Sequence, residues 1–351
     1  MMDLGIDIGS SEIKIFADGK GVVLTEPSVI AIDSMDGSII SYGKRARRMI
    51  GRNPDSIEVV RPIEHGLVAD FDYCEYILKK MIQKVCGNTM IKPKVVVAIP
   101  SVLTNMDRIT IFDAVIAAGA RKVCLVEKPL LASYGAGIEF GSKRGSVVID
   151  IGGGTMDTAV VTYGGLALHD SLKIGGRDID EAIMKYVYDK YNIKIGERTA
   201  EDVKKEIGCA VLPEVVVSME AKGLNINTGL PDVAELTNIE IYDVIKDYLK
   251  KFASSLAGIL EQTPPELVAD ISLEGIHICG GMGKLNSMSK FLSEYIGIPA
   301  KVITEPENCV VRGTASVFEN SRELKAFGYK FRSFEHAEPV GIDENMYEGI
   351  N

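Results

Sequence analysis

Two segments of this 351-residue chain, at residues 4–16 and 147–161, resemble each other closely. Each predicts a strand that ends in Ile-Asp-Ile-Gly, a turn of small residues, and a second strand in which apolar residues alternate with polar ones. The repeat distance, from Asp7 to Asp150, is 150 − 7 = 143 residues. This distance is too long for a solenoid repeat and fits a duplicated domain, so we expect two related α/β halves, the first ending near Gly145.

Buried strands and helices alternate in both halves. Residues 94–101 (KVVVAIPS) and 121–129 (RKVCLVEKP) contain continuous apolar runs, which are typical of strands buried on both faces of a sheet. This alternation indicates mixed sheets covered by helices. The periodicity ends after Leu324, so residues 325–351 are expected to form a frayed tail. Helices are predicted at 104–118, 178–191, 200–207, 239–262, 285–296 and 307–318.

The composition restricts the class of protein. The chain is 46% hydrophobic, 25% charged and 7% aromatic, as in ordinary globular proteins. Its 39 basic and 49 acidic residues give a net charge of −10, which disfavours nucleic acid as a partner. The first residues lack the features of a signal peptide, and no apolar run reaches the length of about 18 residues that a membrane span needs. We therefore expect a cytoplasmic protein.

Neither the cysteines nor the histidines are spaced as metal ligands. The six cysteines include no CxxC pair and lie mostly in apolar runs, which predicts reduced thiols in the core. The four histidines are scattered along the chain. We expect no metal site built from these side chains.

The turns of the two repeated segments can form phosphate-binding loops. Small residues leave successive backbone N–H groups accessible to phosphate oxygens. An aspartate precedes each turn, so Asp7 and Asp150 could face each other across a cleft and hold hydrated Mg²⁺ on the phosphates of a nucleotide. Alternatively, both aspartates only cap their own turns. The loop residues are Gly9, Ser10 and Ser11 in the first segment and Gly152, Gly153, Gly154 and Thr155 in the second.

Two further glycine clusters directly precede predicted helical segments. Residues 279–283 (CGGMG) follow an apolar strand, and their backbone can approach a flat ring closely. Residues 174–178 (IGGRD) end in Asp178, which could cap the helix that follows. Because each cluster alone is a common turn between elements, neither identifies a ligand by itself.

From Gly5 to about Phe318 the chain resembles the actin-like ATPase superfamily, and within it the MreB/Mbl family of bacterial actin homologues. The motifs that carry the resemblance occur in the order and spacing of the family; they are PIEHGLVADFD, AIPS, DIGGGTMDTAVV, GERTAEDVKKEIG, LEQTPPELVADI and CGGMGKL. The resemblance implies a duplicated, actin-like (ribonuclease H-like) α/β fold with two domains around a nucleotide cleft. The implied domains are 1–145 and 146–324, with a tail at 325–351 and a return of the chain to the first domain near 307–318.

The resemblance also implies ATP or ADP with Mg²⁺ as cofactor. The two glycine loops would then bind phosphate, and Asp7 and Asp150 would hold the metal ion through water. Glu201 and Lys204 are the implied ribose contacts, although two charges three apart on one helix could instead form a surface ion pair. The implied nucleotide contacts outside the loops are Gly176, Glu201 and Lys204, and, as an adenine wall, Gly280, Gly281 and Met282.

Two departures from the family pattern bear on hydrolysis. The residue before the proline of the connecting helix is usually a glutamate that orients the attacking water, and here it is Lys128, with Glu127 one residue earlier. A protonated lysine cannot accept a proton from water, although it could stabilise bound ATP. Met156 replaces a threonine expected close to the same water, whereas the acidic residues Asp150 and Asp157 are retained. We therefore expect hydrolysis about ten- to a thousand-fold slower than in a typical relative.

The first glycine hairpin also departs from the family pattern. Glu12 stands at the usual asparagine, and Lys14 occupies the strand position where actin carries a phosphate-binding lysine. Lys14 is therefore a candidate phosphate contact, whereas the charge of Glu12 would repel phosphate. Alternatively, both side chains lie on the exposed face of an edge hairpin.

Members of the MreB/Mbl family polymerise into filaments on the inner face of the cell membrane and guide wall-synthesis complexes. The resemblance therefore implies three partners: other copies of this chain, the membrane, and proteins of wall synthesis or cell shape. The loop 87–92 falls where relatives insert a hydrophobic loop into lipid, so Met90 and Ile91, beside Lys92, are the candidate membrane contacts. Alternatively, Met90 and Ile91 pack inward at a helix end.

Three other functions remain open at this point. A paralogue of the same family could form filaments for motility or shape in a wall-less bacterium. A small-molecule kinase of the same fold would need a base near the γ phosphate, and Lys128 is a poor base. A chaperone-like ATPase would need a substrate-binding domain, which does not follow Phe318 in this sequence.

Overall fold

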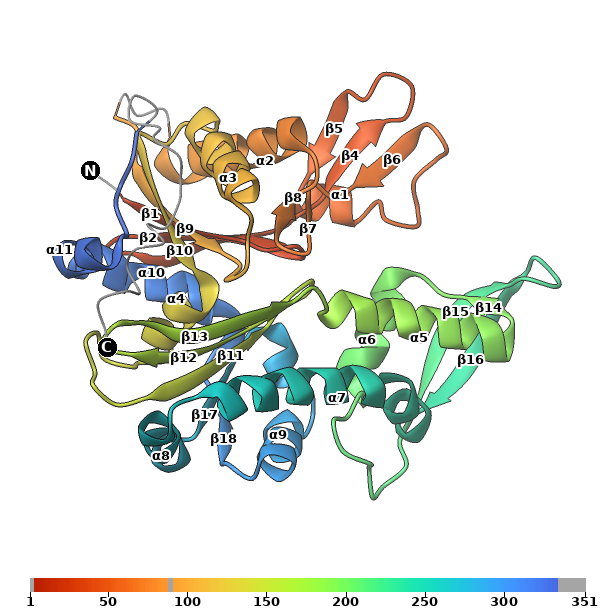
Figure 1. The fold of residues 1–351 in the computed structure, drawn as a ribbon. Coiled ribbons are helices and arrows are strands. Elements are labelled where there is room, and N and C mark those ends of the chain that lie inside the picture. Colours follow the sequence, from red (N-terminus) through yellow and green to blue (C-terminus); the bar gives the residue numbers. More distant parts are fainter. Residues whose placement is uncertain (1–2, 88–90, 334–351) are drawn as a thin grey trace.

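The computed structural model describes residues 3–87 and 91–333, and two five-stranded sheets form its centre (Figure 1). The first sheet consists, in spatial order, of β10 (Lys122–Glu127), β9 (Lys94–Ile99), β1 (Leu4–Ile8), β2 (Glu12–Ala17) and β3 (Gly21–Pro27). The second consists of β18 (Ala300–Val302), β17 (Ile276–Cys279), β11 (Ser146–Ile151), β12 (Met156–Thr162) and β13 (Gly165–Leu172). In each sheet the repeated segment forms a central antiparallel hairpin with two parallel strands on one side.

Two helices, α4 (Lys128–Gly135) and α10 (Cys309–Glu319), lie between the two sheets (Figure 1). They cross very closely at glycines. A Cβ atom added to Gly135 would lie 1.9 Å from the carbonyl oxygen of Cys309, and one added to Gly313 would lie 1.8 Å from that of Leu131. Although α10 comes from the C-terminal part of the chain, it also packs against β1 and β2 of the first sheet.

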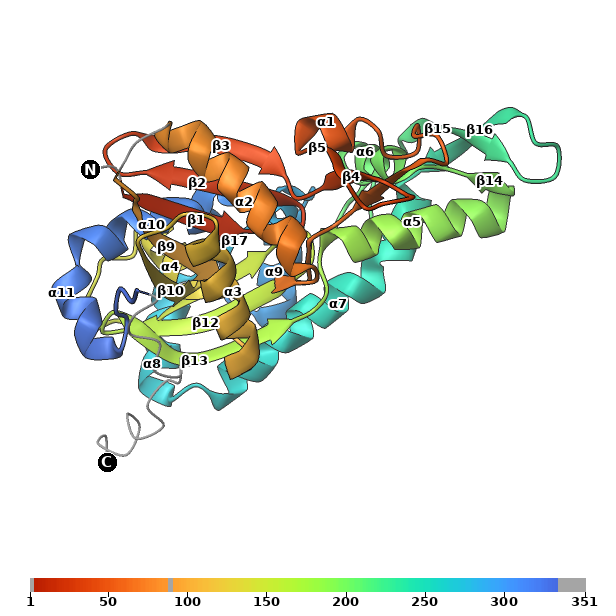
Figure 2. The same ribbon diagram turned by 90° about the horizontal axis from the view of Figure 1, so that it is seen from above.

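Further helices cover the outer faces of the sheets, as Figures 1 and 2 show. Capping residues mark where three of these helices begin. Asp70 caps the helix that starts at Phe71, and capping boxes at Thr104 and Thr237 open the helices that start at Asn105 and Asn238. The first sheet is covered by α2 (Phe71–Cys86) and α3 (Asn105–Ala117), and the second by α7 (Asn238–Gln262), α8 (Pro265–Glu274) and α9 (Met288–Ile296).

A smaller unit extends from each large sheet at the same end of the molecule (Figure 2). The unit of the first half consists of β4 (Ile30–Asp33), β5 (Ile39–Tyr42), α1 (Lys44–Arg47) and β6 (Ile57–Val60), followed by the short hairpin β7 (Ile63–Glu64) and β8 (Leu67–Val68). The unit of the second half consists of α5 (Gly176–Tyr191), β14 (Ile193–Lys194), α6 (Glu197–Ile207), β15 (Ser218–Asn225) and β16 (Pro231–Thr237).

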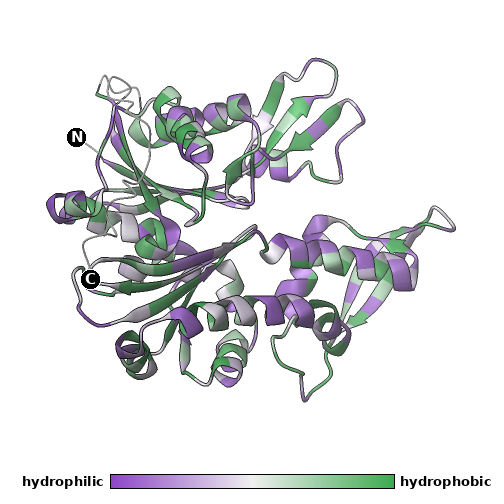
Figure 3. Cartoon of the chain, in the orientation of Figure 1, coloured by the Kyte–Doolittle hydropathy of each residue, from purple (hydrophilic) through white to green (hydrophobic). Residues whose placement is uncertain are grey.

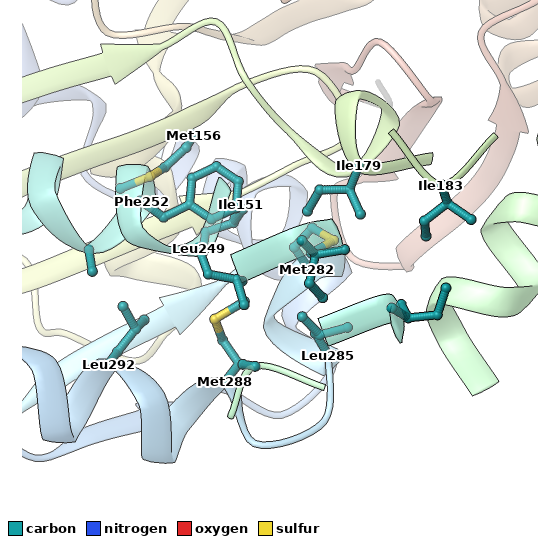
Figure 4. Packing of buried hydrophobic residues seen from close by; sticks show 14 of the residues in the cluster. Ile151, Met156, Ile179, Ile183, Leu249, Phe252, Met282, Leu285, Met288 and Leu292 are labelled. Atoms are coloured by element: carbon teal, nitrogen blue, oxygen red, sulfur yellow. The ribbon is translucent and has the colours of Figure 1, made fainter. Parts of the chain in front are cut away.

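Each half has its own hydrophobic core. Figure 3 shows hydrophobic residues along the strands of both large sheets and many hydrophilic ones along α5 and α6. In the second half, Met156 and Ile151 pack with Phe252 and Leu249 of α7, and the cluster continues to Met282 near α5 (Figure 4). A third cluster fills the space around α4 and α10. Burial of these faces, rather than helix propensity alone, stabilises the outer helices.

The predicted helices are present, and two of them begin later than expected: α10 starts at Cys309 because Pro306–Asn308 form a 3-10 turn, and α9 starts at Met288. Residues 285–287 are not helical, because Gly281–Lys284 form a 3-10 turn (η1) and Ser287 has a φ of 63° before α9 begins. The apolar periodicity that predicts a helix from residue 285 therefore corresponds to a helix only from Met288 onward.

Residues 325–333 correct the expectation of a frayed tail. The chain passes through α11 (Ser321–Leu324) and a 3-10 turn (η3, Lys325–Phe327) and returns to the first sheet. There Arg332 exchanges backbone hydrogen bonds of 2.9 Å in both directions with Val123 of β10, and the ring of Phe331 stacks on that of Phe318. Irregular segments of this kind carry no helical or strand period, so sequence patterns miss them. Residues 334–351 lie outside the described part of the chain.

Among the helices of residues 3–87 and 91–333, none combines the length and the apolar character that crossing a bilayer would need.

Candidate functional site

The two glycine loops, one from each large sheet, face each other. In both hairpins the first glycine closes the turn: Gly9 donates to the carbonyl oxygen of Glu12 at 3.1 Å, and Gly152 to that of Thr155 at 2.8 Å. A Cβ atom added to Gly153 would lie 2.0 Å from Ser11 Oγ, and one added to Gly154 would lie 2.7 Å from Ser10 Oγ. The predicted loops are therefore brought together, and their glycines are required by this close approach.

The hairpin β7–β8 lies against both loops, which the sequence did not indicate. The backbone N–H of Gly66 donates to Ser10 Oγ at 2.9 Å, and the ring nitrogen Nδ1 of His65 is 2.9 Å from the carbonyl oxygen of Gly154. His65 has a φ of 46°, and the spacing of the four histidines in the sequence gives no sign of this role. No short-range signal could identify it, because its role depends on contacts with residues far away in the chain.

The N-terminus of α5 packs against the second loop. The backbone N–H groups of Gly176 and Arg177 donate to the carbonyl oxygens of Gly152 and Gly153 at 3.0 and 2.8 Å. A Cβ atom added to Gly175 would lie 2.6 Å from the carbonyl carbon of Gly153, so only glycine fits there. The glycine cluster at 174–178 therefore supports the loop.

Three aspartates lie near the loops. Asp7 is at the end of β1, Asp150 is at the end of β11, and Asp157 of β12 is the cross-strand neighbour of Asp150. Burial and the charges of Asp7 and Asp157 raise the pKa of Asp150, whereas the charges of Lys128 and Lys14 lower it, and the net result is a pKa of about 7. A nearby cation stabilises the charged form of a carboxylate that is buried among other carboxylates.

The side chain of Lys128 supplies such a cation. It is the first residue of α4, it is buried, and its Nζ atom lies 3.1 Å from Asp7 Oδ1. Burial lowers the pKa of Lys128, but the charges of Asp7, Asp150 and Asp157 outweigh burial and hold that pKa above its ordinary value. The side chain is therefore an ammonium ion and cannot accept a proton.

Glu127 points to a different part of the molecule. Its Oε1 atom accepts a hydrogen bond of 3.0 Å from Nη2 of Arg108, and its Oε2 atom accepts one of 2.7 Å from the hydroxyl of Tyr329. Burial and the nearby Glu127 carboxylate hold the pKa of Tyr329 well above its usual value, so the hydroxyl remains a donor. Both oxygens of Glu127 are thus occupied by α3 and by the C-terminal segment.

Asp157 and Met156 occupy opposite faces of β12. The carboxylate of Asp157 accepts hydrogen bonds from the backbone N–H and the hydroxyl of Ser101, at 3.0 and 3.2 Å, so it joins the second sheet to the end of β9. Within the described part of the chain, Asp157 Oδ2 has no hydrogen-bond partner. Met156 lies in the core with Phe252 (Figure 4). The side chain at position 156 therefore packs in this core, on the face of β12 opposite to Asp157.

Lys14 is a buried neighbour of the site and is not on an exposed edge. Its strand β2 lies between β1 and β3, and Lys14 is the cross-strand partner of Asp7. Its ammonium donates to the backbone carbonyl of Glu307 and lies 3.6 Å from Glu12 Oε2. The structure thus contradicts the alternative in which Lys14 lies on a solvent-exposed edge hairpin.

The remaining glycine cluster lies next to the aspartates. Gly280 has a φ of 82°, and a Cβ atom added to it would lie 2.3 Å from the carbonyl oxygen of Ile151 and 2.7 Å from Asp150 Oδ1. A Cβ atom added to the following Gly281 would meet no heavy atom within 4 Å, so space lies beside that residue. Met282 is buried in the core of the second half (Figure 4).

Lys204 joins several of the predicted nucleotide contacts. Its ammonium donates to the carbonyl oxygen of Gly176 at 2.7 Å and lies 2.7 Å from Asp180 Oδ1. A Cβ atom added to Gly176 would lie 3.1 Å from the sulfur of Met282. The alternative in which Lys204 forms a surface ion pair with Glu201 is therefore wrong, because Lys204 is buried and pairs with Asp180.

Glu201 takes part in contacts between the two smaller units. It forms ion pairs with Arg47 of α1 and, on its own helix, with Lys205. A second ion pair between the units joins Arg61 to Glu197 at 2.5 Å. A pocket of about 500 Å³, lined in part by Arg61, Glu197 and Asn53, opens at this junction and not at the glycine loops.

The structure limits how a metal ion could be held. Within residues 3–87 and 91–333, no three His, Cys, Asp or Glu side chains come together as a metal-binding group. Asp7 and Asp150 could therefore hold Mg²⁺ only with the help of water and nucleotide phosphates, which fits the expected arrangement. Asp7 Oδ1 already lies 3.1 Å from Nζ of Lys128, and a hydrated ion would add a second positive charge beside this carboxylate.

The expected membrane contacts are only partly within the described chain. Ile91 is 59% exposed. Met90 lies outside the described residues.

Comparison with protein families gives one match over most of the chain. The family described as "MreB/Mbl protein" matches residues 1–326. The chain is 37% identical over 323 residues to the cell shape-determining protein Mbl of Bacillus cereus, covering 92% of this chain and 97% of that protein. It is 39% identical over 323 residues to the cell shape-determining protein MreB of Escherichia coli, covering 90% and 93%.

Solved structures agree with this result. MreB5 of Spiroplasma citri, crystallised with ADP, superposes with a TM-score of 0.87 at 33% identity, covering 93% of this chain and 98% of that one. The same protein with AMPPNP gives a TM-score of 0.86. The MamK double helical filament, at 17% identity, gives 0.78 over 91% of this chain and 98% of that one, which is evidence of shared fold alone. The predicted actin-like α/β fold is confirmed.

Proposed function

Because the chain belongs to the MreB/Mbl family, we propose that it is an ATP-binding, actin-like cytoskeletal protein that forms membrane-associated filaments and determines cell shape. The observation that carries this proposal is the opposition of the two glycine loops between the two sheets. The domains of the proposal are 1–145 and 146–324, with α10 returning to pack on the first sheet.

Nucleotide binding is supported by the loops and by the relatives. MreB5 of Spiroplasma citri has been crystallised with ADP and with AMPPNP. In this chain the N–H groups of Ser10, Ser11, Gly153 and Gly154 would surround the phosphates, and the space beside Gly281 would receive the base. When bound, Mg²⁺ would neutralise phosphate charge, held through water by the carboxylates at the ends of β1 and β11.

Hydrolysis in the proposed mechanism is slow because the site lacks a base in the right place. Lys128 carries a proton already, and both oxygens of Glu127 are held by Arg108 and Tyr329. Asp157 has one unpartnered oxygen among the described residues, but Ser101 holds its other oxygen and Lys128 lies nearby. A positioned acid or base contributes about 10² to 10⁴ in rate, so its loss would leave bound ATP long-lived.

Filament formation and membrane contact complete the proposal. Other copies of this chain are the first proposed partner, supported by the fold shared with the MamK filament. The second is the inner face of the cell membrane, contacted by Ile91 and Met90, and cell-wall or cell-shape proteins are the third. The protein would thus be cytoplasmic and peripheral to the membrane. No specific observation favours the kinase or chaperone alternatives.

The proposal is tested with purified protein, Mg·ATP and sedimentation, with and without anionic liposomes. We expect ATP-dependent pelleting that increases with liposomes. Gly153→Val should abolish ATP binding, because its Cβ atom would collide with Ser11 between the loops. Gly258→Ala in α7, where an added Cβ atom meets no heavy atom within 4 Å, is the matched control. A folded wild-type protein that binds no ATP would contradict the proposal.

A further inference from the structure

The charges that act on Asp150 nearly balance before any ligand is added. Three carboxylates, Asp7, Asp150 and Asp157, lie with two ammonium groups, Lys14 and Lys128. With all five groups ionised, three negative and two positive charges leave a net charge of −1. A glutamate in place of Lys128 would change this balance to four negative charges against one positive, a net charge of −3.

The two ammonium groups are held differently. Lys14 donates to the carbonyl oxygen of Glu307 and lies close to the carboxylate of Glu12, so these two groups partly compensate its positive charge. Lys128 lies 3.1 Å from Asp7 Oδ1, the buried oxygen that a hydrated metal ion would otherwise satisfy. Lys128 is therefore placed as a built-in cation on one of the two carboxylates that would hold the metal.

We propose that the Lys128 ammonium takes over part of the charge that Mg²⁺ supplies, so that this chain binds a nucleoside triphosphate with a reduced requirement for a divalent cation. This inference rests on the proposed nucleotide binding. A triphosphate that enters a site of net charge −3 needs a metal ion to overcome repulsion from the carboxylates. At net charge −1, with one positive charge fixed beside Asp7, much of that repulsion is already removed.

The position of Lys128 is fixed by its surroundings, which makes the effect specific to this residue. It begins α4 directly before Pro129, and the preceding Glu127 is anchored by Arg108 and Tyr329. The ammonium is buried, so salt screens its charge less than it screens a surface charge. Lys128 determines the metal requirement in this account, and the loops determine phosphate binding.

The test measures the dissociation constant of a fluorescent ATP analogue in excess Mg²⁺ and in EDTA. For the wild-type protein we expect affinity to fall less than about ten-fold in EDTA. For Lys128→Glu we expect a fall of about a hundred-fold or more, since one charge-assisted contact changes affinity by about ten- to a hundred-fold. Lys128→Gln should fall between the two. Lys246→Gln, on the exposed face of α7, is the control and should behave as wild type.

The outcomes separate this inference from the proposed function. Wild-type protein that binds in Mg²⁺ but loses all binding in EDTA overturns the role of Lys128 and leaves the proposed function intact. Wild-type protein that binds in neither condition overturns the proposed function. If Lys128→Glu fails to fold, as judged by circular dichroism, the wild-type and Lys128→Gln measurements decide alone: equal metal dependence of the two contradicts the inference.

Discussion

The ammonium of Lys128 lies 3.1 Å from Asp7 Oδ1, which brings the start of α4 against the end of β1 beside the first glycine loop. The side chain of the neighbouring Glu127 instead accepts hydrogen bonds from Arg108 and Tyr329. A cation thus lies beside Asp7 at the first residue of α4. The proposed slow hydrolysis and the reduced metal requirement both follow from this one contact.

Replacing Met156 with threonine is expected to lower stability without raising hydrolysis. Met156 packs in the core of the second half, so the change removes apolar contacts and buries a hydroxyl, at a cost of about 2–3 kcal/mol. Urea unfolding and phosphate release measure the two effects. Met106→Thr, at an exposed position of α3, is the control and should leave stability nearly unchanged. Faster phosphate release by the Met156 variant would show that residue 156 acts on the reaction.

Replacing Tyr329 with phenylalanine is expected to loosen the C-terminal segment. The change keeps the ring but removes the hydroxyl that donates to Glu127, which should destabilise the protein by about 1–2 kcal/mol. Hydrogen exchange should become faster in residues 325–333. The exposed Tyr188 provides the control, Tyr188→Phe. Unchanged stability together with unchanged exchange would mean that the contact does not anchor the segment.

Gly313→Ala is expected to be strongly destabilising. The added Cβ atom would lie 1.8 Å from the carbonyl oxygen of Leu131, so α10 and α4 must move apart, at a cost of about 3 kcal/mol. Gly258→Ala, in open space on α7, should instead stabilise the helix by about 0.5–1 kcal/mol. Thermal unfolding of both variants gives the comparison. Equal melting temperatures would refute the close crossing of the two central helices.

Acid should selectively remove the stabilisation that Glu240 provides. Partial burial raises the pKa of Glu240, but hydrogen bonds from Lys190, Tyr191 and Thr237 outweigh burial and lower this pKa from 4.5 to about 2. Because the pKa is lower in the folded state, the stabilisation is complete above about pH 4.5 and is lost as the pH falls towards 2.

The stability difference between wild type and Glu240→Gln should therefore shrink between pH 5 and pH 3, as measured by urea unfolding. Glu206→Gln, at an exposed position of α6, serves as control. A difference that stays constant with pH would contradict the depressed pKa.

The sequence was most informative where a feature is local or repeated. The two segments with the shared Ile-Asp-Ile-Gly motif predicted equivalent strands, and β1–β2 and β11–β12 occupy equivalent places in their sheets. Periodicity located the helices, because each buries one apolar face. It failed at residues 285–287, where the backbone conformation of Ser287 breaks the helix.

The sequence was least informative where a residue acts through a distant partner. His65, Ser101 and Tyr329 reach the glycine loops or the residues around them from other parts of the chain. His65 and Ser101 lie in the motifs PIEHG and AIPS, but the motifs do not say which distant atoms these side chains contact. The side-chain direction of Met156 also depends on which face of β12 meets α7. Strand alternation separates the faces of residues 156 and 157 but does not say which face meets the cleft.

The most direct test of the central claim is single-turnover phosphate release from bound ATP at saturating Mg²⁺, comparing the wild type with Lys128→Glu and Lys128→Gln. We expect Lys128→Glu to release phosphate about ten- to a thousand-fold faster than wild type, since a carboxylate can orient and deprotonate water. Lys128→Gln should gain less because it adds no base. A Lys128→Glu protein that folds and binds ATP but releases phosphate no faster than wild type would contradict the claim that Lys128 is what makes hydrolysis slow.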